Sequence, residues 1–119
     1  YRNTTININK DYKMYYIYML RCKDNSIYTG ITVNLAKRMN EHFSQGKKCA
    51  KYTLNHTPQK LEIAWTADNR SLASKLEYQI KALTKQQKET LITTKLLEKF
   101  FNEKLDINCY ALAEYDKEK

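Results

Sequence analysis

Aromatic and β-branched side chains dominate residues 15–21, which is the composition of a β-strand. Residues 23–26, Lys-Asp-Asn-Ser, carry side chains that favour a turn. Residues 27–31 then return to the strand composition. We therefore predict an antiparallel hairpin over residues 15–31.

The pattern changes to a helical spacing after the hairpin. Asn34 has the side chain of an N-cap, and Gly46 is a residue at which a helix would end. Between them, apolar side chains recur every four residues, at Leu35, Met39 and Phe43. This spacing predicts an amphipathic helix to about residue 45, with those three side chains facing the core.

A basic segment separates this helix from a third strand. Its lysines run from Lys47 to Lys60, and Pro58 excludes a helix through it. Residues 61–66, which include Trp65, have the composition of a short strand. We predict that this strand joins the hairpin in one sheet.

The rest of the chain has helical patterning. Ser71 is a candidate N-cap for a helix whose apolar side chains follow at helical spacing, at Leu72, Leu76, Ile80 and Leu83. Further helices are predicted at residues 85–92 and 94–104, and the charged tail from Asn108 is expected to be poorly ordered. The fold class is α/β (α+β): a small three-stranded, mainly antiparallel sheet flanked by helices.

The length of the chain sets its domain organisation. A chain of 119 residues can bury one modest core and is too short for two ordinary domains. We assign residues 14–92 to that domain and residues 93–119 to a C-terminal helical extension and tail. Residues 1–13 are polar and have no hydrophobic period, which predicts a flexible arm or a cloning remnant. A monomer is the favoured state.

The charge of the chain points to an anionic partner. Twenty-one Lys and Arg against thirteen Asp and Glu give a net charge of +8, and nucleic acid, with DNA favoured, is the partner this balance indicates. No apolar run approaches the roughly 20 residues that cross a bilayer, so we expect no membrane association and a cytoplasmic protein. The three cysteines lack the spacing of a zinc site and are expected to be reduced thiols.

Four side chains could meet on one face of the sheet. Arg38 and His42 lie one helical turn apart and flank the apolar stripe, which places them at the edge of the core. If this helix packs across the hairpin, the hydroxyls of Tyr18 and Tyr28 converge on the guanidinium. A guanidinium can neutralise charge on phosphoryl oxygens, and a carboxylate can hold a hard cation that helps a water attack. The set therefore predicts a site for phosphodiester hydrolysis.

The same residues carry a resemblance to a known family. The segments YIY at residues 16–18 and YTG at residues 28–30, followed in order by Arg38, His42 and Glu77, resemble the GIY-YIG nuclease superfamily. The resemblance covers about residues 14–92 and is to the small stand-alone, single-domain branch. It implies a metal-dependent endonuclease that hydrolyses DNA phosphodiester bonds, single-stranded or branched DNA included.

The resemblance also implies a role for each residue. Glu77 would bind one divalent cation, Mg²⁺ or Mn²⁺, and Arg38 would stabilise the phosphoryl transition state. Tyr18 and Tyr28 would orient or deprotonate the water, and either could be the base. His42 would contact the phosphate or assist proton transfer.

The chain departs from the family pattern at three places. Tyr16 replaces the first glycine of the name motif and Thr29 replaces its second isoleucine, while the hydroxyl-bearing positions are intact. Residues 81–88 lack the asparagine that many members carry after the metal-binding glutamate, which bears on how the site closes.

Each candidate also has an ordinary structural interpretation. Glu77 precedes Lys81 by four residues, the spacing of a routine helix salt bridge, and His42 could be a hydrogen-bonded core histidine. The basic segment is either a solvated loop or a groove that follows a nucleic-acid backbone through Lys47, Lys48, Lys51 and Tyr52.

Two functional alternatives stay open on the sequence. One is a nucleic-acid-binding module that has the same fold and lacks catalysis. The other is a protein-interaction domain whose C-terminal helices present an apolar face formed by Leu96, Leu97, Phe100 and Phe101.

Overall fold

The computed structural model of the chain describes residues 13–44 and 50–114. The predicted arm, apart from its last residue, and the site candidates Lys47 and Lys48 lie outside these ranges. No helix within the two ranges is long and apolar enough to cross a membrane.

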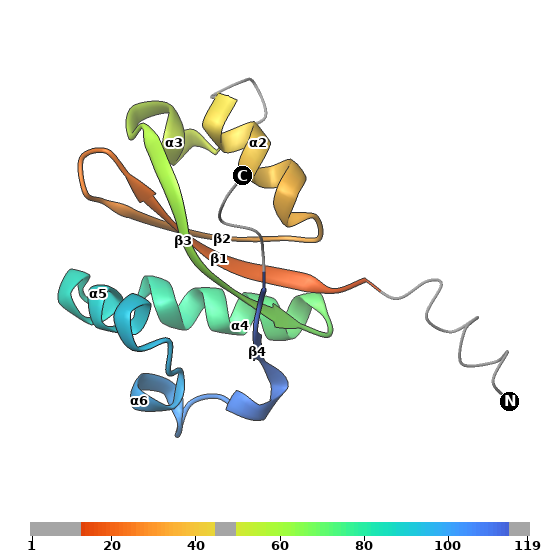
Figure 1. Cartoon of the computed structure of the whole chain (residues 1–119). Helices are drawn as coiled ribbons and strands as arrows, with labels where there is room; N and C mark the ends of the chain where they lie inside the picture. Colours follow the sequence, from red (N-terminus) through yellow and green to blue (C-terminus); the bar gives the residue numbers. More distant parts are fainter. Residues whose placement is uncertain (1–12, 45–49, 115–119) are drawn as a thin grey trace, which may run out of the picture.

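The predicted hairpin forms half of one antiparallel sheet (Figure 1). Strand β1 (Tyr15–Cys22) pairs on one side with β2 (Ile27–Thr32), and on the other with β3 (Pro58–Ala67). A short β4 (Ala111–Leu112) pairs with β3, which gives the order β2-β1-β3-β4. The predicted count of three strands is therefore wrong by one, because a two-residue strand is too short to show an alternating pattern.

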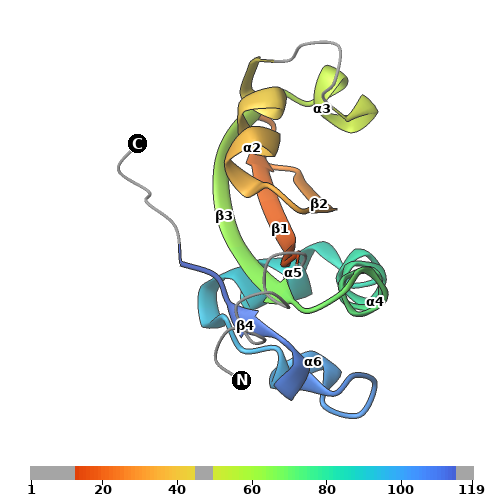
Figure 2. The ribbon, with the colours of Figure 1, turned by 90° about the vertical axis from the view of Figure 1, so that its right-hand side faces the viewer.

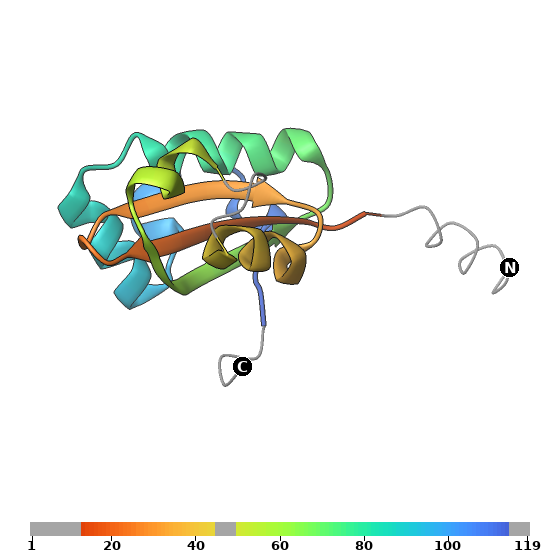
Figure 3. The ribbon, with the colours of Figure 1, turned by 90° about the horizontal axis from the view of Figure 1, so that it is seen from above.

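Helices cover both faces of the sheet (Figures 1 and 2). Helix α2 (Leu35–Ser44) and the short α3 (Lys51–Asn55) lie on one side, and α4 (Arg70–Lys81), α5 (Lys85–Thr94) and α6 (Glu98–Phe101) lie on the other. Seen from above, α4 runs along the edge strand β2, with which it is in contact (Figure 3).

The alternation of β1 divides the core into two clusters. Ile17 and Met19 face α4 and pack with buried side chains that include Leu76. Tyr18 and Leu20 point to the opposite face and pack against α2. Successive side chains of a strand point to opposite faces, so β1 contributes to both clusters.

The inward face of α2 differs from the prediction. Asn34 caps the helix as expected, because its Oδ1 accepts the N–H of Lys37 at 3.0 Å. Phe43, however, is 44% exposed, whereas His42 is fully buried. At 3.6 residues per turn, position 42 lies closer than position 43 to the line through Leu35 and Met39. The inward placement of Phe43 was therefore wrong.

Two helix boundaries differ from the predictions, and one helix was not predicted. Asn69, rather than Ser71, caps α4 by accepting the N–H of Leu72. Lys95 adopts a left-handed conformation, with φ 64°, which ends α5 and replaces the predicted helix over residues 94–104 with the short α6. The segment predicted as a basic loop contains α3.

The C-terminal segment packs on the domain as far as Ala113, whose N–H donates to the Ala64 carbonyl. A 3₁₀ turn (Ile107–Cys109) precedes β4, and the Tyr110 hydroxyl donates to the Leu72 carbonyl at 2.7 Å. The predicted poor order from Asn108 is therefore wrong for residues 108–114. Leu97 and Phe101 are buried in the cluster around Ile17, so the apolar face expected for a protein partner is largely internal. The division at residue 92 stays a prediction.

Candidate active site

The side chain of Tyr18 extends over Gly30 of the neighbouring strand. The two residues are cross-strand partners in the β1–β2 pairing. A Cβ atom at Gly30 would lie 2.6 Å from Oη and 2.8 Å from Cζ of Tyr18, closer than real Cβ contacts come. Only glycine leaves room for the phenol, so the YTG segment contributes space as well as a hydroxyl.

Two hydrogen bonds fix the ring of His42. The Oη atom of Tyr18 lies 2.7 Å from its Nε2 atom, and the Oγ1 atom of Thr53 lies 3.1 Å from its Nδ1 atom. His42 is on α2 and Thr53 is on α3, so the imidazole joins the central strand to both helices on this face of the sheet. The sequence had placed His42 at the edge of the core, and the structure places it inside.

The partner of Thr53 decides the tautomer of this imidazole. The Thr53 hydroxyl donates its one proton to the carbonyl of Ala50 at 2.9 Å. Its oxygen can therefore only accept from His42, which assigns the ring proton to Nδ1. The Nε2 atom then has a free lone pair and accepts the proton of Tyr18. This geometry makes His42 the acceptor and Tyr18 the donor.

Burial keeps the imidazole neutral. It lowers the pKa of His42 from 6.5 to about 4, and the positive charge of Arg38 acts in the same direction. A neutral histidine at physiological pH is able to accept a proton, as the tautomer requires.

The two tyrosines differ in access to solvent. Tyr18 is 1% exposed, and burial raises the pKa of its phenol well above the ordinary value, with a further rise from the neighbouring Tyr28. Tyr28 is half-buried, and its ring centroid lies 6.1 Å from that of Tyr18 and 5.4 Å from that of His42. Tyr28 is thus the outer and Tyr18 the inner hydroxyl of the group.

Arg38 lies beside the inner tyrosine and carries a carboxylate partner. Its Nη1 atom donates to Glu41 Oε1 at 2.7 Å, and both side chains are more than three-quarters buried. Hydrogen bonding and charge from the same guanidinium lower the pKa of Tyr18, opposing the effect of burial. Arg38 therefore forms an ion pair with Glu41 and also interacts with Tyr18.

Glu77 is the carboxylate of α4, the helix that contacts the edge strand β2. Its Oε2 atom lies 3.3 Å from Nζ of Lys81, and its side chain is 23% exposed. The same Nζ atom lies 5.9 Å from the ring centroid of Tyr28, which connects α4 to the tyrosines. Within residues 13–44 and 50–114, no three His, Cys, Asp or Glu side chains gather as a self-sufficient metal site.

The sequence that carries these site residues matches the model of a known protein family. The model of the GIY-YIG catalytic domain matches residues 14–90, a span that contains both tyrosine segments, Arg38, His42 and Glu77. The chain belongs to the GIY-YIG family. GIY-YIG domains are in general endonucleases, so the domain is of a nuclease type.

Bacterial members of similar size share much of this sequence. The chain is 48% identical over 79 residues to UPF0213 protein FN1575 of Fusobacterium nucleatum, covering 66% of this chain and 77% of that protein. It is 43% identical over 82 residues to UPF0213 protein DP2720 of Desulfotalea psychrophila, covering 69% and 74%. The solution structure of UPF0213 protein BH0048 from Bacillus halodurans is 35% identical, with a TM-score of 0.46 and coverage of 78% and 97%.

One of the predicted nucleic-acid contacts, Tyr52, lies beside a GIY-YIG tyrosine. The ring centroid of Tyr52 is 5.5 Å from that of Tyr28, and the Tyr52 ring stacks on His56 at 4.1 Å. Lys51 is exposed at the start of α3. The groove assigned to these residues stays a prediction.

Sequence reasoning assigned no role to two residues that shape this GIY-YIG site. Gly30 was counted only as the end of a tripeptide, although its cross-strand position opposite Tyr18 follows from the hairpin register. Thr53 lies in the basic segment, and its contact with His42 depends on α3, a short helix that the basic composition of this segment concealed.

Proposed function

We propose that this protein is a divalent-metal-dependent endonuclease that hydrolyses DNA phosphodiester bonds by an activated water. The observation that carries the proposal is the 2.7 Å contact between Oη of Tyr18 and Nε2 of His42. The hydrogen bond from Thr53 to Ala50 assigns Tyr18 as the donor in this contact. A packing histidine does not need this tautomer, whereas proton transfer from a tyrosine does.

The exposures of the two tyrosines give the proton route a direction. Tyr18 gives its one proton to His42, so its oxygen can accept from Tyr28. The attacking water gives a proton to Tyr28, Tyr28 passes its own to Tyr18, and Tyr18 passes its own to Nε2 of His42. The water oxygen forms the new bond to phosphorus while the bond to the leaving oxygen breaks. Tyr28 is therefore the base that meets the water, and Tyr18 relays its proton.

The charges around His42 tie this route to an anionic substrate. Its pKa of about 4 makes it a weak base in the free protein, partly because Arg38 is close. A bound phosphodiester would offset the positive charge of Arg38 and favour the imidazolium. Arg38 in turn stabilises the charge that develops on the phosphoryl oxygens.

The donor set around Glu77 fits Mg²⁺ or Mn²⁺. Mg²⁺ retains several waters and needs only one or two carboxylates together with substrate phosphates, so one glutamate suffices. Glu77 is accessible, and its partner Lys81 is a half-exposed side chain that can turn aside. When bound, the cation would neutralise phosphoryl charge and lower the pKa of a coordinated water.

Cleavage assays with matched variants test the proposal. Labelled single-stranded, duplex and branched DNA are incubated with the protein and Mg²⁺, Mn²⁺ or a chelator. Arg38→Ala and Glu77→Gln should each lower the cleavage rate by about 10²- to 10³-fold, the usual effect of losing one transition-state contact. Lys37→Ala and Tyr78→Phe alter exposed neighbours on the same helices and should cleave as the unaltered protein does.

Two results would contradict the proposal. If the unaltered protein cleaves nothing with either cation but still binds DNA in a salt-sensitive manner, it is a binding module without catalysis. If Glu77→Gln cleaves at the full rate, the cation is not held by Glu77.

A further inference from the structure

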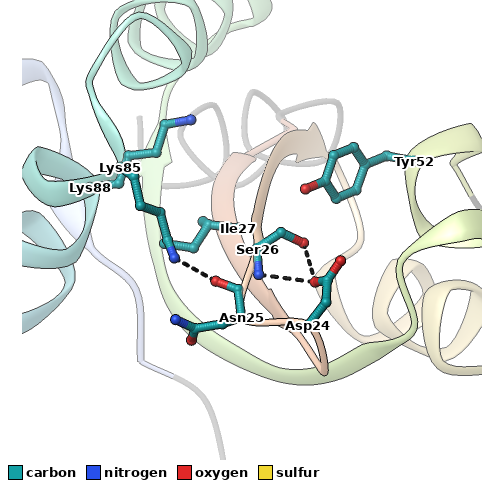
Figure 4. Close-up of a pocket in the computed structure, with 7 residues that line it drawn as sticks. All are labelled: Asp24, Asn25, Ser26, Ile27, Tyr52, Lys85 and Lys88. Carbon is teal, nitrogen blue, oxygen red and sulfur yellow. Dashed lines mark hydrogen bonds between the residues drawn. The ribbon is translucent and has the colours of Figure 1, made fainter.

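A pocket opens at the tip of the hairpin, next to the tyrosines of the candidate active site (Figure 4). It has a volume of about 390 Å³. Residues 24–27 of the hairpin form its floor, with Lys85 and Lys88 on one side and Tyr52 on the other. Tyr52 also contacts Tyr28, so one wall of the pocket is a direct neighbour of the outer tyrosine.

The ammonium group of Lys88 has no counter-ion in the described part of the chain. Its side chain is half-buried, and its closest charged neighbours include Lys81 and Lys85. Burial lowers the pKa of Lys88, and these two lysines lower it further. Lys81 and Lys85 differ from Lys88 because each pairs with a carboxylate, Glu77 and Glu89 respectively. An unpaired cation among cations is an unfavourable arrangement that an anion would relieve.

The hydroxyl of Tyr52 is a second donor directed at the same space. Figure 4 shows it pointing from the Tyr52 ring toward the pocket. It forms no hydrogen bond with any other residue in the ranges that the structure describes, although the Tyr52 ring is held by stacking on His56. A positioned hydroxyl opposite a half-buried ammonium is suited to the oxygens of a phosphate.

One carboxylate lines the pocket, and its oxygens are already engaged in hydrogen bonds. Asp24 accepts both the N–H and the hydroxyl of Ser26, at 3.0 and 2.6 Å, and it pairs with Nδ1 of His56 at 2.6 Å. These contacts lower the pKa of Asp24, so it stays a carboxylate that is engaged with the hairpin and α3. It therefore opposes an anion less than a free aspartate would.

We propose that this pocket binds a backbone phosphate of the cleaved strand, next to the phosphate that reacts, through Lys88 and Tyr52. The inference rests on the proposed nuclease function for the identity of the ligand. Because it involves only the backbone, the contact positions the strand without reading its sequence. It would draw the strand past Tyr28 toward the tip of the hairpin.

Binding measurements in a chelator test this site without cleavage. The anisotropy of a labelled single-stranded oligonucleotide is measured over a range of salt concentrations. Lys88→Met retains the apolar stem and removes the charge, so affinity should fall about tenfold, as expected for one charged hydrogen bond. The slope of log K against log salt should fall in magnitude by about 0.7, the value for one phosphate on a single strand.

Two further variants separate the contributions of charge and hydroxyl. Tyr52→Phe should weaken binding severalfold with an unchanged salt slope, because it removes a neutral donor. Lys99→Met, on the exposed surface of α6, is the matched control and should change neither quantity. Inorganic phosphate is added as a competitor, and it should displace the oligonucleotide less effectively from Lys88→Met than from the unaltered protein.

The melting temperature without DNA distinguishes a ligand site from a structural lysine. Lys88→Met should melt at the same or a higher temperature, because an unpaired cation is removed. Lys88→Met with unchanged affinity and salt slope would overturn the inference, as would a lowered melting temperature that accounts for the loss of binding. Failure of the pocket proposal and failure of the nuclease proposal give different results. A protein that cleaves DNA but binds it with the same affinity and salt slope whether or not Lys88 is altered lacks the pocket function, whereas one that binds through Lys88 and never cleaves lacks the nuclease function.

Discussion

The Oη atom of Tyr18 lies 2.7 Å from Nε2 of His42, although the two residues are 24 positions apart and lie on different elements. Both side chains are almost completely buried. The chemistry of the candidate site is therefore coupled to the packing of α2 on the sheet, and a variant that disturbs one is expected to disturb the other. Cleavage rates of variants at either residue therefore need a stability measurement beside them.

Thr53→Val should impair cleavage by changing the proton on His42. Valine has nearly the shape of threonine, but it leaves the Nδ1–H of the buried imidazole without an acceptor. We expect a loss of about 1–3 kcal/mol in the free energy of unfolding and a mixture of tautomers. Nitrogen chemical shifts of the His42 ring, together with single-turnover cleavage rates, measure both effects.

Thr53→Ser is the control for this variant. It retains a hydroxyl that can donate to Ala50 and accept from His42, so it should restore the tautomer and most of the rate. Equal cleavage by the valine and serine variants would show that the hydroxyl has no part in the reaction.

Gly30→Ala should displace Tyr18. The added methyl would meet Oη and Cζ at 2.6 and 2.8 Å, and His42 prevents the phenol from moving freely. We expect a destabilisation of about 1–3 kcal/mol, typical of an overpacked core, together with a loss of cleavage. Urea unfolding gives the stability. In a Tyr18→Phe background the penalty should be smaller, and an equal penalty there would place the clash elsewhere.

Acidification should weaken the fold through His42. The unfolded histidine titrates near 6.5 and the folded one near 4, so between these values the unfolded chain binds a proton that the folded chain excludes. The contribution of neutral His42 to the free energy of unfolding is therefore complete above pH 6.5. It decreases as the pH falls toward 4, by about 3 kcal/mol at most. Urea unfolding across this range measures the slope.

A His42→Gln variant should lose this part of the pH dependence. Glu89 affects stability only at lower pH. Arg21 lowers the pKa of Glu89 from 4.5 to about 2, so the stability that this carboxylate contributes decreases only below about pH 4.5. An unchanged slope between pH 6.5 and 4.5 in His42→Gln would mean that another group is responsible.

Arg21→Leu should loosen the tip of the hairpin from α5. Arg21 donates to both carboxylate oxygens of Glu89, at 2.6 and 2.7 Å, and to Glu62 at 2.9 Å, and its side chain is 11% exposed. Removing it leaves Glu62 mostly buried without this partner. The free energy of unfolding should fall by about 2–4 kcal/mol. This is slightly less than the usual effect of breaking a fully buried ion pair, because Glu89 is partly exposed.

Arg21→Lys provides the comparison for the ion pair. It retains the charge and loses the two-pronged contact, so its stability should lie between those of Arg21→Leu and the unaltered protein. Urea unfolding of the three proteins decides the order. A leucine variant as stable as the original would show that the network contributes no net stability.

The sequence predicted the parts of the fold that have strong local signals. The hairpin follows from its aromatic content and its turn, and the cap of α2 follows from one asparagine. The short elements α3, α6 and β4 have too few residues to show a period, and they form because neighbouring elements hold them. Local composition was misleading there.

The candidate site was predicted as a set of residues but not as an arrangement. Helical spacing indicated that Arg38 and His42 share one side of α2, and both do approach Tyr18. The choice of Phe43 as the inward residue missed the burial of His42, because a polar ring was not counted among core side chains. The direction of the hydrogen bonds of His42 depends on Thr53. A contact between two separate helices produces no regular spacing in the sequence, so it could not be predicted.

The alternation of β1 limits how this chain can change over evolutionary time. Tyr18 and Leu20 face α2, while Ile17 and Met19 face the opposite cluster. Inserting or deleting one residue within the first half of this strand would exchange the two sets, directing the reactive phenol toward α4 and an aliphatic side chain toward His42. Length changes in this part of the protein are therefore confined to the turn after Cys22, whereas point substitutions that preserve the two-residue period remain accessible to selection.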